Sequence, residues 1–235
     1  AVADIRKIAT LHYDTDIAMS LYRAFTDINS DINADTERGL RFRLLRRNEP
    51  LPLSDVLPIL ENLGLRVLGE RPYAIRRVDE PVVWIHEFSL SYAWVEGIDL
   101  SEVSAQFQET FARVWYGEAE NDAFNKLVLG TGLGWRPCAM LRAYGRYMKQ
   151  AGSAFSGEYI AETLAQHLPI THLLVQLFHV RFDPTLDRSD AERRENGLHA
   201  RLLAALDDVQ NLGQDRIIRH YLALMRATVR TNFFQ

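Results

Sequence analysis

The sequence predicts an α+β domain, an antiparallel sheet packed against two helices, over residues 1–117, followed by an all-α helical bundle over residues 118–235. The first prediction rests on short segments in which apolar and polar side chains alternate, the pattern of strands that bury one face. The second rests on the loss of that alternation after about residue 119, where apolar side chains recur at helical spacing. A hydrophobic fraction of 47% in 235 residues is enough to build a core in both domains.

Two strands are expected first, at residues 17–23 and 40–44. In the second strand, three apolar side chains alternate with Arg41 and Arg43, so one face is apolar and the other is basic. Residues 27–39 lie between the strands and are rich in Asp, Asn and Ser. This segment has too little apolar surface for a core, which predicts a mobile loop.

Two amphipathic helices complete the first domain. The earlier helix is expected to have Ser54 as its N-cap and Pro58 in its first turn, where a proline is tolerated. The later helix is expected after Asp99 and Glu102, which stand in capping-box spacing, and its apolar positions continue to Trp115.

Two more strands are expected between these helices, at residues 65–75 and 82–92. An interruption with a bulge or bend is predicted at residues 69–72, and residues 78–81 are interpreted as a hairpin turn. The resulting order of strand, strand, helix, strand, strand and helix allows an antiparallel sheet to bury one face against both helices.

Helical patterns fill most of the second domain. Ser156 is expected to cap one helix, and Gly197 and Gly213 are candidate breaks within the last. The predicted helices cover residues 135–151, 156–167, 169–182 and 188–230.

Charge, cysteine content and hydropathy exclude several classes of protein. A net charge of −4 and a pI near 6.0 argue against a basic nucleic-acid binder. Cys138 is the single cysteine and is interpreted as a buried structural thiol, and no apolar run is long enough for a membrane span. We therefore expect a cytoplasmic protein that contacts neither nucleic acid nor a membrane. Because the chain opens on Ala1 and closes on Gln235 without a polar tail, we also expect a segment of a longer protein.

No catalytic or metal-binding pattern stands out in the sequence. Residues 130–134 (GTGLG) invite comparison with a dinucleotide-binding turn, but Trp135 stands where the third glycine is needed, so a helix end and a turn are predicted instead. His167, His172 and His179 are five and seven positions apart, whereas metal ligands on one helix need three or four. We predict no metal site.

A basic strand offers the candidate effector site. Its guanidinium groups can hold a carboxylate by paired hydrogen bonds, and the loop and helix start after it offer free backbone amides to an anion. The alternative interpretation is a solvated strand face whose arginines form salt bridges with nearby acids. The candidate effector-binding residues are Arg41, Arg43, Asn48, Ser54 and Asp55.

Several stretches carry a resemblance to a known family. They are residues 53–67 (LSDVLPILENLGLRV) with 70–73 (ERPY), 141–144 (LRAY), and 177–178 (LF) with 181–184 (RFDP). Together they resemble the large bacterial NAD-specific glutamate dehydrogenases over most of the chain from about residue 40. The closing residues 230–235 resemble the point just before the catalytic domain of that family.

The resemblance implies an ACT-like, ferredoxin-like fold for the first domain and a helical motif region for the second. In that family the catalytic lysine and the NAD-binding domain lie downstream, and none of Lys7, Lys126 and Lys149 stands in a matching glycine-rich segment. The full subunit is expected to interconvert L-glutamate and 2-oxoglutarate with NAD, while this segment is non-catalytic and binds no cofactor. It is expected to serve regulation and homo-oligomerisation, to contact its own catalytic domain and other subunits, and to sense an amino-acid effector.

Two other functions stay open. One is a purely structural spacer that binds no amino acid. The other is a nucleic-acid module, which would need exposed aromatic side chains on the strands of a ferredoxin-like sheet. Trp84, Phe88 and Tyr92 recur on one strand face, and their alternative interpretation is core or a partner surface.

Overall fold

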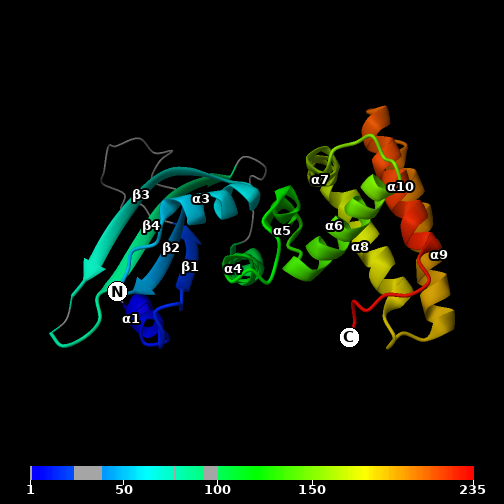
Figure 1. Cartoon of the computed structure of the whole chain (residues 1–235). Helices are drawn as coiled ribbons and strands as arrows, with labels where there is room; N and C mark the ends of the chain where they lie inside the picture. Colours follow the sequence, from blue (N-terminus) through cyan, green and yellow to red (C-terminus); the bar gives the residue numbers. More distant parts are fainter. Residues whose placement is uncertain (1, 24–38, 77, 93–99) are drawn as a thin grey trace. The chain divides into compact units, whose positions relative to one another are not determined.

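The structure is a computed structural model of the whole chain (Figure 1). It describes every residue except 1, 24–38, 77 and 93–99. The described residues form two compact units, residues 1–121 and 122–235. The first unit combines a sheet with helices and the second is helical, which confirms the predicted fold class.

The first unit is built around one sheet. In chain order its main elements are β1 (Ala18–Arg23), β2 (Leu40–Arg47), α3 (Leu53–Asn62), β3 (Leu65–Ile75), β4 (Val83–Tyr92) and α4 (Leu100–Trp115). Among the described residues the strands form an antiparallel sheet in the order β1-β2-β4-β3. The chain passes from β2 through α3 to β3 and leaves room for β4 between them, which is the split β-α-β arrangement of ferredoxin-like folds. β1, which comes first in the chain, pairs with β2 at the edge of this sheet.

Aromatic side chains form the centre of the core between the sheet and the helices. Phe42 of β2 and Phe88 of β4 are opposite each other in the strand register, and both are fully buried. The rings of Phe107 and Phe111 on α4 have their centroids 5.1 Å from that of Phe42. Tilted and edge-on rings at this separation add an attraction of their own to the burial of apolar surface.

A short helix, α1 (Val2–Ile8), covers part of the opposite sheet face. Ile8 and Leu11 pack there against Leu45 and Ile85, which face away from the aromatic core because successive strand residues point to opposite sides. This helix was not predicted, because its seven residues are too few to establish a helical period.

The predicted start of α3 is wrong in its details. Ser54 is not the N-cap, because the helix begins at Leu53, and the Ser54 hydroxyl donates a hydrogen bond to the Asp55 carboxylate at 3.2 Å. Pro52 occupies the N-cap position without a side-chain cap, and its ring fixes the φ angle at the helix entry. Pro58 therefore lies beyond the first turn.

Three further predictions for this unit concern a bulge in β3, a loop and a capping pair. The expected bulge occurs between Val67 and Gly69, but β3 is not interrupted, since pairing with β4 continues through residues 69–72. Of the predicted loop at residues 27–39, only residue 39 is described. The side chains of the predicted capping pair, Asp99 and Glu102, also lie outside the described residues.

The second unit is a helical bundle. Its elements are η1 (Ala123–Asn125), α5 (Lys126–Thr131), α6 (Trp135–Gln150), α7 (Gly157–Gln166), α8 (Leu168–Phe182), α9 (Arg188–Leu206) and α10 (Leu212–Ala227). α8 packs along α9, and α10 packs against α6, α7 and α8 (Figure 1). In the part of the chain that the structure describes, no helix has the length and apolar character needed to cross a bilayer.

Two predicted helix ends in this unit are confirmed. Gly132 has a φ of 68° and closes α5 in the left-handed conformation, so the glycine-rich stretch is a helix end followed by a turn. The Ser156 hydroxyl accepts a hydrogen bond from the backbone N–H of Tyr159 and is the N-cap of α7.

The predicted helix at residues 188–230 is two helices. The break falls at residues 207–211, not at Gly197, which lies inside α9. Asn211 caps α10 by accepting hydrogen bonds from the next backbone amides, and Gly213 lies in the first turn of that helix. The asparagine cap therefore determines the boundary, while Gly197 is tolerated within its helix.

α6 comes close to its neighbours at Gly145. Tyr221 of α10 is fully buried and donates a hydrogen bond to the carbonyl oxygen of Leu141 at 2.8 Å. A Cβ atom on Gly145 would lie 2.8 Å from Cζ of Phe124 and 3.0 Å from the hydroxyl oxygen of Tyr221. The packing of three elements therefore requires a residue without a side chain at this position.

Replacing Gly145 by alanine should lower the free energy of unfolding by about 1–3 kcal/mol, because overpacking outweighs the gain in helix propensity. Gly197→Ala is the matched control, since no atom lies within 4 Å of the added Cβ. That control should raise the free energy of unfolding by about 0.5–1 kcal/mol. Urea titration followed by circular dichroism measures both. Stabilisation by both substitutions would contradict the close approach at Gly145.

Candidate functional site

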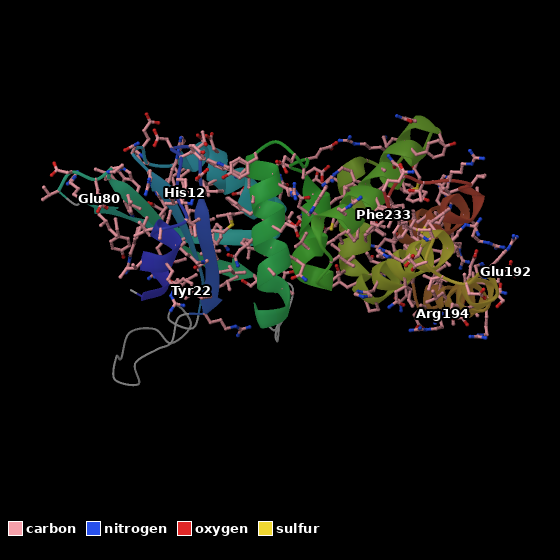
Figure 2. All side chains as sticks on the ribbon, turned by 90° about the horizontal axis from the view of Figure 1, so that it is seen from below. His12, Tyr22, Glu80, Glu192, Arg194 and Phe233 are labelled. Carbon is pink, nitrogen blue, oxygen red and sulfur yellow. The ribbon has the colours of Figure 1, made fainter. Side chains whose placement is uncertain are left out.

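The two arginines predicted to hold an effector lie in the first half of β2, on the sheet face opposite α3 and α4. Arg43 stands across from Glu87 of β4 in the register and forms an ion pair with it. Tyr22, labelled on β1 in Figure 2, donates a hydrogen bond to the same carboxylate at 2.6 Å. The Arg43 guanidinium also lies 5.0 Å from the centroid of the Tyr22 ring. Sequence spacing did not reveal Tyr22 or Glu87, because the partners depend on the register between strands.

This network controls the charge of Glu87. Burial alone would raise the pKa of the Glu87 carboxyl, but hydrogen bonds from Tyr22 and Arg43, with the charges of Arg43 and Arg41, outweigh it and lower the pKa. Glu87 is therefore an anion at neutral pH. Arg43 is already neutralised by this partner, as the alternative interpretation of a salt-bridged strand face predicted.

Arg41 lies two residues away on the same face as Arg43. It stands between Tyr22 of β1 and Ser89 of β4 in the strand register. Among the described residues Arg41 has no ion-pair or hydrogen-bond partner. It is thus the member of the predicted arginine pair whose charge is available to a ligand.

Asn48 stabilises the turn that follows β2. Its φ of 63° is in the left-handed region, and its amide donates a hydrogen bond to the Asp14 carboxylate at 2.6 Å. Its backbone carbonyl accepts a hydrogen bond from the indole of Trp84 at 3.2 Å, and its backbone N–H bonds to Val82 at 2.8 Å. Asparagine tolerates this conformation better than most residues, so it suits the turn.

Ser54 and Asp55 lie at the exposed start of α3, on the helix side of the sheet. The chain before α3 is held there by His86 of β4, whose Nε2 accepts a hydrogen bond from the backbone N–H of Leu51 at 3.1 Å. His86 Nδ1 lies 2.8 Å from the Glu70 carboxylate, and its side chain is almost fully buried. These partners are satisfied when Nδ1 carries the proton and Nε2 does not.

The five candidate effector-binding residues therefore occupy three places. Arg41 and Arg43 share the sheet face opposite α3 and α4, and Asn48 is engaged in a turn. Ser54 and Asp55 lie on the other side of the sheet, because α3 packs with α4 over the face that carries Phe88. The strand alternation correctly separated the arginines from the core, but it does not state which residues meet across the sheet.

The second unit contains a buried arginine that pairs with a partly exposed aspartate. Arg142 of α6 is 5% exposed and makes two hydrogen bonds to Asp122, of 2.7 and 2.9 Å, and one of 2.8 Å to Asn125. Asp122 also caps η1 through the backbone N–H of Phe124. Cys138 is buried, as predicted for a structural thiol, and burial raises the pKa of its thiol to about 12.

A cavity of about 640 Å³ opens in the second unit between α6, α8 and the residues that follow α10. Its aromatic lining consists of Trp135, Tyr144, Tyr147, Phe178 and Phe233, the last of which is labelled in Figure 2. The hydroxyl groups of two lining residues, Tyr144 and Thr228, share a hydrogen bond of 2.8 Å. This cavity could not be predicted from local sequence patterns, because its walls come from segments about 80 residues apart.

Arg181 joins three helices next to this cavity. Its Nη1 lies 2.6 Å from the Glu195 carboxylate of α9, and its Nη2 donates to the carbonyl oxygen of Arg226 in α10 at 2.8 Å. A charged donor that satisfies a helix-terminal carbonyl stabilises the end of that helix. Arg181 therefore fixes the end of α10 against α8 and α9.

Within the described residues, no three His, Cys, Asp or Glu side chains are grouped to hold a metal ion.

Three family models match successive parts of the chain. Residues 16–103 match the family described as glutamate dehydrogenase, ACT3 domain, and residues 119–184 match glutamate dehydrogenase, helical motif 3. Residues 201–235 match bacterial NAD-glutamate dehydrogenase, catalytic domain, so the expectation that residues 230–235 come just before that domain is wrong. The third match includes α10, which is part of the same compact unit as the second.

Two curated relatives match this chain over its full length, and a third matches most of it. An NAD-specific glutamate dehydrogenase of Halomonas elongata is 44% identical over 235 residues, covering 100% of this chain and 14% of the relative. The protein of the same name from Pseudomonas aeruginosa is 44% identical over 237 residues, with the same coverage. That from Mycobacterium tuberculosis is 37% identical over 77% of this chain and 12% of its own length. The chain thus spans about one seventh of the first two relatives.

The Glu87 network predicts a pH-dependent contribution to stability. Because the Glu87 pKa in the folded protein lies below its ordinary value of 4.5, the contribution is present above that value and is lost as the pH falls through the lowered pKa. Glu87→Gln should lower the free energy of unfolding by about 1–3 kcal/mol at neutral pH and have little effect at about pH 2.

Denaturant titration at both pH values measures this difference. Glu61→Gln, on the exposed surface of α3, is the control and should change the free energy of unfolding by less than about 0.5 kcal/mol. An effect of Glu87→Gln that is equal at the two pH values would be inconsistent with an ionised, hydrogen-bonded Glu87.

Proposed function

The chain belongs to the NAD-specific glutamate dehydrogenase family, and from this premise we propose that it is a regulatory and assembly segment of a subunit that interconverts L-glutamate and 2-oxoglutarate with NAD. The observation that carries the proposal is the match of an ACT3 domain and a helical motif to the sheet-containing and helical units. Catalysis is assigned to the rest of the subunit, because only residues 201–235 match the catalytic-domain family.

The residues of the chain support a non-catalytic role. The glycine-rich stretch that invited comparison with a dinucleotide-binding turn closes α5 and is followed by α6, not by the strand-turn-helix context that NAD binding needs. Of the three lysines, Lys126 lies in α5 and forms an ion pair with Glu162. Lys149 lies in α6. We therefore propose that NAD is bound elsewhere in the subunit.

We propose further that an amino-acid effector binds at Arg41, on the sheet face opposite α3 and α4. A free amino acid carries a carboxylate and an ammonium group, so it needs a cation and an anion close together. Arg41 offers an available guanidinium, and Glu87 lies on the same face two register positions along, next to Ser89. The Arg41 guanidinium thus offers a charge for the carboxylate of an amino acid. The Glu87 carboxylate, which already pairs with Arg43, is the anion on the same face that its ammonium group would approach.

Assembly is the second part of the proposed role. The segment would hold its own catalytic domain and the other subunits of a homo-oligomer in place, in the cytoplasm. One observation favours a competing candidate, the structural spacer. Arg43 is paired with Glu87, and in a spacer the charges on this sheet face would only stabilise the fold. A nucleic-acid module is disfavoured, because Phe88, the central ring of the three strand aromatics, is fully buried and cannot stack on a base.

The 235-residue chain should show no glutamate-dependent reduction of NAD. A spectrophotometric assay with glutamate and NAD measures this directly, with the complete subunit as the positive control. Turnover by the 235-residue chain above the blank would refute the proposed division of labour.

An amino acid that binds at Arg41 should raise the unfolding temperature of the chain. At 100 times the dissociation constant the added free energy of unfolding is about 2.7 kcal/mol. Arg41→Met should abolish this shift, whereas Arg66→Met, an exposed arginine of β3, should leave it unchanged. A panel of amino acids in a thermal-shift assay provides the measurement. The absence of any shift would favour the spacer.

A further inference from the structure

We propose that the cavity beside α6 binds a planar aromatic anion, a ring compound that carries one carboxylate or phosphate group. The binding follows from the side chains of the second unit alone. Its regulatory meaning rests on the function proposed above.

The size and walls of the cavity suit a flat ligand. Its volume of about 640 Å³ falls within the range of about 300–1,000 Å³ that is typical of small-molecule sites. Five aromatic rings contribute to the walls, while Ala139 and Ala143 on α6 have small side chains that leave space between the rings. Rings favour another ring in offset or edge-on contact, so the cavity recognises an aromatic ligand.

The charge of the lining selects an anion. Arg136 and Arg230 contribute to the lining, and no Asp or Glu does among the described residues. Arg136 donates a hydrogen bond to the carbonyl oxygen of Phe233 at 2.6 Å and lies 5.4 Å from the centroid of that ring. Arg230 has no ion pair or hydrogen bond within the described parts of the chain. A guanidinium without a counter-charge beside an aromatic cavity is complementary to a carboxylate or a phosphate.

The same lining discriminates against a free amino acid. An aromatic amino acid would place its ammonium group near two guanidinium groups with no acidic side chain to neutralise it. The like charges oppose binding, and the ammonium group loses part of its hydration without gaining an ion pair. The cavity is therefore distinct in chemistry from the sheet face at Arg41.

The position of the cavity gives the ligand a regulatory role. One wall is α6, which lies in the helical-motif match, and the other is residues 224–233, which lie in the catalytic-domain match. A ligand that contacts both walls holds the two segments together and favours the conformation in which they are packed. Occupancy of the cavity would thus be communicated to the catalytic part of the subunit.

Isothermal titration calorimetry of the 235-residue chain tests the site with matched compounds. 3-Phenylpropionate and phenyl phosphate carry a ring and an anion, 3-phenylpropan-1-ol carries the ring without charge, and L-phenylalanine adds an ammonium group to the carboxylate. We expect one or both of the anions to bind, and the alcohol and the amino acid to bind at least about tenfold more weakly, because a charge-assisted hydrogen bond contributes more than a factor of ten. Comparison of the two anions distinguishes a carboxylate site from a phosphate site.

Matched variants locate the binding. Arg230→Met should weaken the better anion about tenfold, and Arg230→Lys should restore part of the affinity. Arg216→Met removes an equally exposed arginine from α10 outside the cavity and should have no effect. Ala143→Phe fills the space between the rings and should abolish binding of both anions.

Three outcomes would overturn the proposal: no binding of either anion, equal binding of the alcohol or of L-phenylalanine, or equal loss with Arg230→Met and Arg216→Met. These binding measurements do not use the dehydrogenase assay. Absence of ligand binding to the cavity is therefore distinguishable from failure of the proposed function. If the cavity binds but the anion leaves the activity of the complete subunit unchanged, the binding site stands and its regulatory role is refuted.

Discussion

The pairing of β2 with β4 is the constraint on which the first unit depends. Its register brings Phe42 against Phe88 on one face and Arg43 against Glu87 on the other. Because strand side chains alternate, a shift by one residue would exchange these faces and bury charges in the aromatic core. The same pairing therefore determines where α3 and α4 pack and where the charged face lies. The candidate effector face and the hydrophobic core are two results of one register.

In the second unit, the buried contacts of α6 have the corresponding role. Arg142 is held by Asp122 and Asn125, which fixes η1 beside the helix, while Gly145 allows Phe124 and Tyr221 to come close. Removing the Asp122 carboxylate would leave the buried Arg142 guanidinium without its counter-charge, so this arrangement tolerates little change at Asp122. One wall of the aromatic cavity is the same helix, and its position is therefore set by packing on the opposite side.

The fold class and the order of its elements could be predicted because they depend on local patterns. The alternation around Arg41 and Arg43 and the cap at Ser156 are examples of such signals. The missed features depend on contacts between distant segments. The Tyr22 hydrogen bond to Glu87 requires the strand register, and the cavity requires α6 to meet the residues after α10. Ser54 was misplaced because the backbone of Pro52 provides the helix entry without a side-chain cap.

The place of α10 shows that the borders of sequence families and the borders of physical units differ in this protein. The helix belongs by sequence to the catalytic-domain family, yet its buried side chains, among them Tyr221 and Met225, complete the core of the helical unit. A cut in the chain at the family border near residue 200 would expose apolar surface on both fragments, which invites aggregation. Recombination between relatives at that border would likewise join a helix to a core with which it had not evolved. Exchange of the whole unit, with α10 retained, preserves the matched surfaces.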